Sequence, residues 1–204
     1  MLLLGLTTDR TLIGYRQCEN MTEDKIIENI QSRTDAKLRY ASVHLDEMKS
    51  KGIVGGDDFD RAHQESFLFH ILGVKESFLC ELNKYYKLEI SDSEISPGNL
   101  RKALDKVGLK SPELAELYNL ENNKESWLFH AKSIRDHSTH VSSVPRHFHL
   151  GGENHQKVFI SNPKTGKIID RHINDEFTDW LTKMKVLISR LRATGLEFHS
   201  THWR

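Results

Sequence analysis

The chain has 204 residues, of which 37% are hydrophobic and 28% are charged, a balance that suits a globular protein and excludes a disordered one. Its 29 Lys and Arg residues equal its 29 Asp and Glu residues, so any nucleic-acid site has to be a local patch. The two cysteines form no disulfide framework and suit a reducing compartment, and no apolar run approaches the length that spans a membrane. We therefore expect a cytoplasmic protein without membrane contact.

The first half of the chain predicts two long amphipathic helices. Thr22 is a favourable N-cap for the first, which ends at Gly52, and the second begins at Asp57 or Asp58 and runs to about Tyr86. Apolar residues recur every three or four positions, at Ile27, Ile30, Thr34, Leu38, Ala41, Leu45 and Met48 in the first helix and at Phe67, Leu68, Ile71, Leu72, Val74, Phe78, Leu79 and Leu82 in the second. Two long helices joined by a short glycine turn pack as an antiparallel hairpin.

Residues 90–123 are more broken and predict two short helices. The first covers residues 100–107 and ends at Gly108, and the second starts at Ser111-Pro112, a cap followed by a proline. A break at residues 122–123 precedes a further amphipathic helix, which we expect from about Lys124 to Val141.

Between residues 142 and 174 the periodicity changes to that of strands. Apolar runs at 158–160 and 168–169 flank a turn at 162–166 that contains proline and glycine, which is typical of a β-hairpin. Asn174 then caps a last helix that Gly195 ends. The apolar stripe of this helix consists of Phe177, Trp180, Leu181, Met184, Leu187, Ile188 and Leu191.

Together these elements predict a mainly α protein, a four- to five-helix up-and-down bundle with a small β-hairpin inserted before the last helix. The sequence has no internal repeat, low-complexity tract or change of composition, so we expect residues 1–204 to form a single domain. Its core spans residues 22–193, and the ends, residues 1–21 and 196–204, are expected to be flexible or loosely packed.

One stretch at the end of a predicted helix, Arg135-Asp136-His137-Ser138-Thr139-His140, carries the strongest functional signal. It resembles the motif of the HEPN nucleases, which are helical bundles in which Arg is followed after four to six residues by His, often with a polar residue directly after the Arg. Arg39–His44 and Arg192–His199 have a similar spacing, but neither combines an acidic residue after the Arg with a position at a helix end. The resemblance covers residues 22–193 in outline and only these six residues in detail.

The resemblance implies a metal-independent endoribonuclease of toxin or defence type. An imidazole, whose pKa lies near neutral pH, can take a proton from a ribose 2′-hydroxyl. A guanidinium can hold the phosphate and stabilise the charge that develops on it. His140 would then be the base or acid, Arg135 the phosphate holder and Asp136 the residue that orients one of them. Sites of this family are usually completed by a second protomer, so the resemblance also implies a homodimer, with RNA as substrate and an antitoxin or other protein as a candidate partner.

Further candidate substrate-binding residues follow the motif in a His-rich loop. His147 and His149 alternate as on a strand, so both can face one partner, and the basic and aromatic mix of this loop is suited to RNA. We therefore assign substrate binding to His137, Arg146, His147 and His149. The site needs no cofactor and no metal.

Two other interpretations remain open. Arg135 and Asp136 can be ordinary surface charges, with His140 stabilising a helix end through the helix dipole, in a chain that is a non-catalytic dimeric interaction module. Paired imidazoles seven residues apart, His63 with His70 and His130 with His137, could instead hold a metal between two helices. His70, however, lies among apolar residues, which favours a hydrogen-bonded core histidine.

Overall fold

The computed structural model describes residues 23–51, 58–148 and 158–202, and within them the chain is mainly helical. In chain order the helices are α1 (Glu23–Ser50), α2 (Asp58–Tyr85), α3 (Pro97–Lys106), α4 (Pro112–Asn122), α5 (Trp127–His140) and α6 (Ile173–His202), with a short 3-10 turn at Asp92–Glu94. The strands β1 (Arg146–Phe148), β2 (Val158–Ser161) and β3 (Ile168–Ile169) lie between α5 and α6. A mainly α bundle with a small β-element before the last helix is therefore confirmed.

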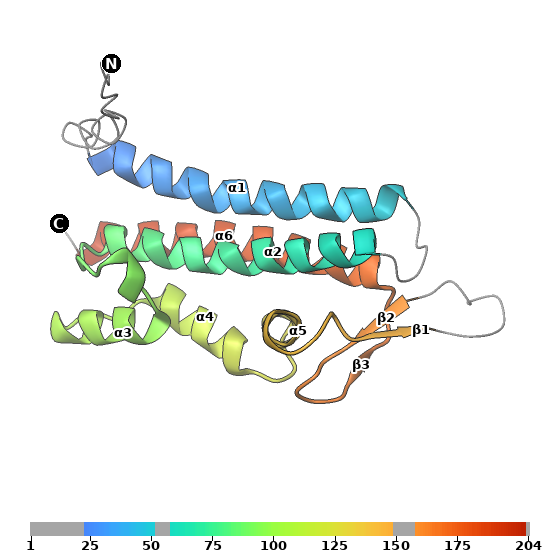
Figure 1. Ribbon diagram of the computed structural model, residues 1–204. Helices are drawn as coiled ribbons and strands as arrows, with labels where there is room; N and C mark the ends of the chain where they lie inside the picture. The colour runs from blue at the N-terminus through green and yellow to red at the C-terminus, as the bar shows by residue number, and fades with distance from the viewer. Residues whose placement is uncertain (1–22, 52–57, 149–157, 203–204) are drawn as a thin grey trace, which may run out of the picture.

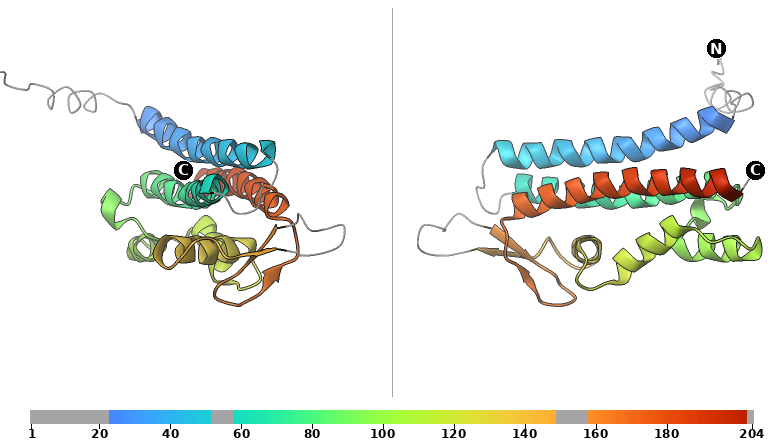
Figure 2. Two further views of the ribbon diagram at one scale, coloured as in Figure 1. Left: turned by 45° about the vertical axis from the view of Figure 1, so that its right-hand side comes forward. Right: turned by 180° about the vertical axis from the view of Figure 1, so that it is seen from behind.

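The helices form three layers, with α2 and α6 in the middle one (Figures 1 and 2). The long helices α1, α2 and α6 run alongside one another, with α6 behind α2 in the first view and in front of it when the molecule is seen from behind (Figures 1 and 2). The shorter helices α3, α4 and α5 cover α2 and α6 on the side away from α1 (Figure 1). The predicted hairpin of α1 and α2 is confirmed, and α2 is central, as the width of its apolar stripe indicates.

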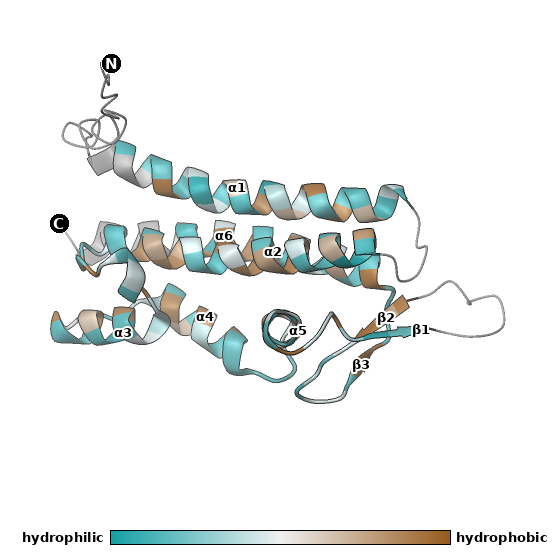
Figure 3. Cartoon of the chain, viewed as in Figure 1, coloured by the Kyte–Doolittle hydropathy of each residue, from teal (hydrophilic) through white to brown (hydrophobic). Residues whose placement is uncertain are grey.

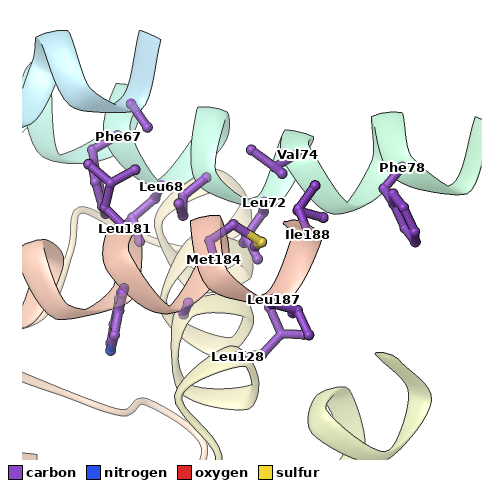
Figure 4. Packing of buried hydrophobic residues seen from close by; sticks show 14 of the residues in the cluster. Phe67, Leu68, Leu72, Val74, Phe78, Leu128, Leu181, Met184, Leu187 and Ile188 are labelled. Carbon is purple, nitrogen blue, oxygen red and sulfur yellow. The ribbon is translucent and has the colours of Figure 1, made fainter. Parts of the chain in front are cut away.

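The hydrophobic core lies where α2, α5 and α6 meet. Figure 4 shows Leu72 of α2 beside Met184 of α6, with Leu128 of α5 below them and with Phe67 and Phe78 further along α2 on either side. Each of these five side chains is almost completely buried, and the rings of Phe67 and Phe177 stack at a centroid distance of 4.4 Å. Apolar residues line the inward faces of the helices and polar residues the outward faces (Figure 3), which accounts for the layered arrangement.

Serine caps set the starts of the three shorter helices. The hydroxyls of Ser96, Ser111 and Ser126 accept hydrogen bonds from the backbone N–H groups three residues further on, at Asn99, Leu114 and Phe129. An N-cap side chain satisfies a helix N–H that otherwise has no partner, so each helix begins directly after its serine. For α5 this places the start at Trp127 rather than at the predicted Lys124.

A three-stranded antiparallel sheet with the order β1-β2-β3 packs against the start of α6. The predicted hairpin of β2 and β3 is confirmed, with Ile160 paired to Ile169, and β1 adds a third strand in which His147 pairs with Phe159. The connecting turn is held by Asn162, whose Oδ1 accepts from the backbone N–H groups of Lys164 and Thr165. Asn162 is completely buried and anchors the turn to the core, whereas residues 164–167 are exposed.

The predicted end of the last helix at Gly195 is wrong, because α6 continues to His202. Gly195 packs instead against the buried carboxyl group of Glu113 on α4, and a Cβ atom at this position would lie only 2.5 Å from Glu113 Oε1. Glycine is thus used here for close approach between two helices rather than for a helix end. None of the helices in the described parts of the chain is both long enough and apolar enough to cross a membrane.

Candidate functional site

Helix α5, which carries the motif, is anchored through its first ten residues. Leu128, Ala131 and Ile134 are completely buried in the core. The buried ring of His130 lies with Nδ1 2.7 Å from the side-chain nitrogen of Asn162, and burial, as the largest cause, lowers the pKa of this histidine. His130 therefore ties α5 to the β2–β3 turn as a neutral imidazole, and the exposed residues of the helix, Thr139 and His140, lie at its end.

Arg135 lies on the side of α5 that faces α2 and is about a quarter exposed. Its Nε is 3.1 Å from Asp136 Oδ1 and its Nη2 is 3.7 Å from Glu76 Oε1 of α2. Neither contact is a hydrogen bond: the first has the wrong direction for one, and the second is too long. The two carboxylates thus orient the guanidinium without using its N–H donors.

Arg135 is the end of a longer chain of alternating charges that joins α2, α4 and α5. Lys132 lies 3.3 Å from Asp136 Oδ2 and 3.8 Å from Glu121 of α4, and Glu121 in turn accepts a hydrogen bond from the buried Lys75 at 3.0 Å. Charges of opposite sign alternate along the chain, so it holds the three helices in register. These partners come from residues up to about 60 positions away from Arg135, and no local pattern in the sequence identifies them.

His140 is exposed and lies on a different side of α5 from Arg135. Five residues correspond to about 140° around an α-helix, whereas the four residues from Asp136 to His140 correspond to only about 40°. Asp136 therefore lies between the two, beside His140 on the outward face. The structure places the three predicted catalytic residues around one helix end, but it does not bring Arg135 and His140 into contact within one chain.

The turn after α5 is built from serine hydroxyls. His137 Nε2 lies 3.1 Å from the hydroxyl of Ser142, and Arg61 of α2 donates a hydrogen bond to the hydroxyl of Ser143 at 3.0 Å. Arg61 is exposed, so a second guanidinium reaches the surface beside the end of α5. No pattern in the sequence identifies Arg61, because it precedes the motif by more than 70 residues and the packing of α2 brings it here.

The predicted substrate-binding residues are separated by the structure. Arg146 lines a small cavity together with Asp60 and Gln64, and its Nη2 has no exposed surface. His147 is exposed on β1, and His149 lies outside the described residues. His137 and His147 are therefore accessible to a substrate, whereas Arg146 extends into the protein.

The histidine pairs proposed for a metal do not face one another. His63 and His70 of α2 meet His44 of α1, where His44 Nδ1 and His63 Nδ1 are 3.1 Å apart and the rings of His44 and His70 stack at 5.4 Å. His130 is bonded to Asn162 on the other side of α2. Within the residues that the structure describes, no group of three or more His, Cys, Asp or Glu side chains is arranged to hold a metal ion.

Comparison with known proteins identifies the family and no characterised relative. Residues 29–198, most of the chain, match the protein family DUF6586, which is described only as a family of unknown function. No curated protein and no solved structure is significantly similar to the chain. The chain therefore belongs to the DUF6586 family, whose function is unknown.

Proposed function

We propose that this protein is a HEPN-like, metal-independent endoribonuclease that uses Arg135, Asp136 and His140 at the end of α5. The observation that supports the proposal best is the state of Arg135. Its guanidinium is oriented by Asp136 and Glu76 and remains partly exposed, yet it donates no hydrogen bond to either carboxylate. Donors that are held in place but unused are suited to a phosphate, whose oxygens accept from a guanidinium fork.

The chemistry follows from the groups present. His140 takes the proton of a ribose 2′-hydroxyl, and the resulting oxygen attacks the adjacent phosphorus while the bond to the 5′-oxygen breaks. A second imidazole or water returns a proton to the 5′-oxygen, so the products are a 2′,3′-cyclic phosphate and a 5′-hydroxyl. Arg135 stabilises the additional negative charge on the phosphate, and Asp136 keeps the guanidinium oriented.

The separation of Arg135 and His140 around α5 supports a homodimer. With about 140° between them on one helix, they cannot both contact one phosphodiester from the same side. Two copies that meet at the ends of their α5 helices would pair Arg135 of one protomer with His140 of its partner. We place this dimer in the cytoplasm, with RNA as its substrate and an antitoxin-type protein as a candidate partner.

The test is RNA cleavage by the purified protein in the presence of a chelator. We expect the wild type to produce fragments that end in a 2′,3′-cyclic phosphate, and we expect Arg135→Ala and His140→Ala to abolish cleavage. Arg190→Ala is the matched control, since Arg190 is an exposed arginine of α6 that pairs with Glu116 of α4. Intact RNA with the wild type, or equal cleavage by the variants, would show the proposal to be wrong.

A non-catalytic interaction module is the second candidate, and the chain of alternating charges favours it. If Arg135 serves only to join α5 to α2, Arg135→Ala lowers the free energy of unfolding and no variant cleaves RNA. His140→Ala, which removes an exposed side chain, then has no effect in either assay. The two candidates thus differ in what His140 does.

A further inference from the structure

Six aromatic rings form a continuous row along the seam between α1 and α2, away from α5. We call this row the aromatic stripe, and its members in spatial order are Phe59, His63, His44 and His70, with Tyr40 and Phe69 each in contact with His70. Successive ring centroids are between 4.1 and 5.4 Å apart, which is contact distance for stacked and edge-on rings. The two helices thus present a row of flat groups and not merely an apolar seam.

Part of the stripe is exposed, although its rings could have been buried between the helices. Tyr40 is 49% exposed and Phe69 is 55% exposed, and Val43, one turn after Tyr40, is 55% exposed. Within the described residues, three of the eight exposed large hydrophobic side chains therefore gather at this one place. Isolated exposed apolar residues are ordinary, but a contiguous group marks a surface that contacts a partner.

Positive charge lies over both ends of the stripe. Lys37 Nζ is 4.9 Å from the ring centre of Phe69, and Lys51 Nζ is 3.3 Å from the ring centre of Phe59. The side chain of Lys37 reaches this position across Gly73, where a Cβ would lie 3.4 Å from Lys37 Cδ. Two carboxylates lie close to the row as well, since Glu47 interacts with His44 and the exposed Glu65 precedes Phe69 by one helical turn on α2.

From this arrangement we infer that the aromatic stripe binds single-stranded RNA. Exposed rings beside ammonium groups are the two components of surfaces that hold single strands, in which bases stack on the rings and phosphates meet the cations. The ammonium groups of Lys37 and Lys51 lie directly over rings of the stripe and complement the charge of a phosphate backbone, which favours a polyanion as the occupant. The choice of RNA rests on the proposed function, whereas the choice of a single-stranded polyanion rests on the rings and the lysines alone.

The experiment measures binding of a short fluorescein-labelled 2′-O-methyl RNA by fluorescence anisotropy. This strand cannot be cleaved through its 2′ position, so binding is measured independently of catalysis by Arg135 and His140. We expect Tyr40→Ala and Phe69→Ala each to weaken binding about tenfold, the loss of one stacked base. Tyr40→Phe and Phe69→Tyr, which keep a ring, should bind like the wild type.

Two further measurements make the test specific. Lys37→Gln should reduce the slope of log affinity against log salt by about 0.7, as expected for one phosphate contact to a single strand. Val186→Ala is the matched control because Val186 is equally exposed, on α6. Absence of binding by the wild type, or unchanged binding in both alanine variants, overturns the inference. So does a change of sedimentation coefficient in these variants without a change in RNA binding, since the stripe is then an interface between copies of the chain.

Discussion

Replacing Gly195 by alanine is expected to destabilise the protein, although alanine is the better helix former. In the interior of a helix, Gly→Ala ordinarily stabilises by about 1 kcal/mol. Here the new Cβ would lie 2.5 Å from Glu113 Oε1, closer than two such atoms approach. Either the carboxyl group or the two helices must move.

The cost follows from what holds that carboxyl group. Glu113 is 1% exposed, and its Oε2 accepts hydrogen bonds from the hydroxyls of Tyr86 at 3.0 Å and Ser111 at 2.6 Å. Burial chiefly raises the pKa of Tyr86, so its hydroxyl remains a donor. Bonds of this kind to a charged group contribute about 1.5 kcal/mol each at the lower end, so losing both costs about 3 kcal/mol. Subtracting the helix gain leaves a destabilisation of about 2 kcal/mol.

Thermal unfolding followed by circular dichroism tests this expectation. For a chain of this length, a loss of about 2 kcal/mol lowers Tm by about 4–8 °C. Gly73→Ala is the matched control, since its Cβ meets only the flexible side chain of Lys37 at 3.4 Å, and we expect it to be neutral or stabilising. A Gly195→Ala variant with the Tm of the wild type or above would refute the role of Gly195 in close packing.

Three further predictions concern the other buried polar groups. Burial lowers the pKa of His44 and of His70 below the ordinary value of 6.5, so at low pH the unfolded chain binds more protons than the folded one. The free energy of unfolding should therefore be highest above pH 6.5 and fall as the pH drops below that value. His44→Gln should flatten this pH dependence in urea titrations. Asn162→Ala removes the bond to His130 and two turn bonds, and should lower the free energy of unfolding by about 3 kcal/mol; an unchanged urea midpoint would contradict this. Arg192→Met leaves the buried carboxylate of Glu81 on α2 without its bidentate partner and should lower the free energy of unfolding by about 2 kcal/mol. A variant as stable as the wild type would show that this ion pair contributes little to stability.

The helical bundle with its β-element could be expected in outline, because the signals for its elements are local. The apolar stripes of α1, α2 and α6 recur at helical spacing, and a residue three or four positions away is a neighbour on the helix whatever the rest of the chain does. The same holds for the caps at Ser111 and the turn around Asn162, which depend on bonds within three residues. The sequence indicates β1 only through the alternation of His147 and His149, because three residues carry little periodicity and their partner β2 lies beyond residues 149–157.

The candidate site, unlike these elements, depends mostly on contacts between residues far apart in the sequence. The motif at the end of α5 was visible in the sequence, and the exposure of His140 follows from its position at a helix end. The partners of Arg135 and the presence of Arg61 beside Ser143 were not visible, because they depend on how α2 packs against α5. Likewise, the sequence places His63 on one face of α2 but does not show that His44 of α1 lies beside it.

The sequence by itself thus determined which segments are helices and which faces of them are apolar, since both are set by neighbours within one or two turns. Only the tertiary structure decided that Gly195 serves close packing rather than a helix end, that His44 lies between His63 and His70, and that Arg135 is oriented by a carboxylate of α2. Each of these depends on contacts between residues far apart in the chain, and such contacts leave no periodic pattern in the sequence.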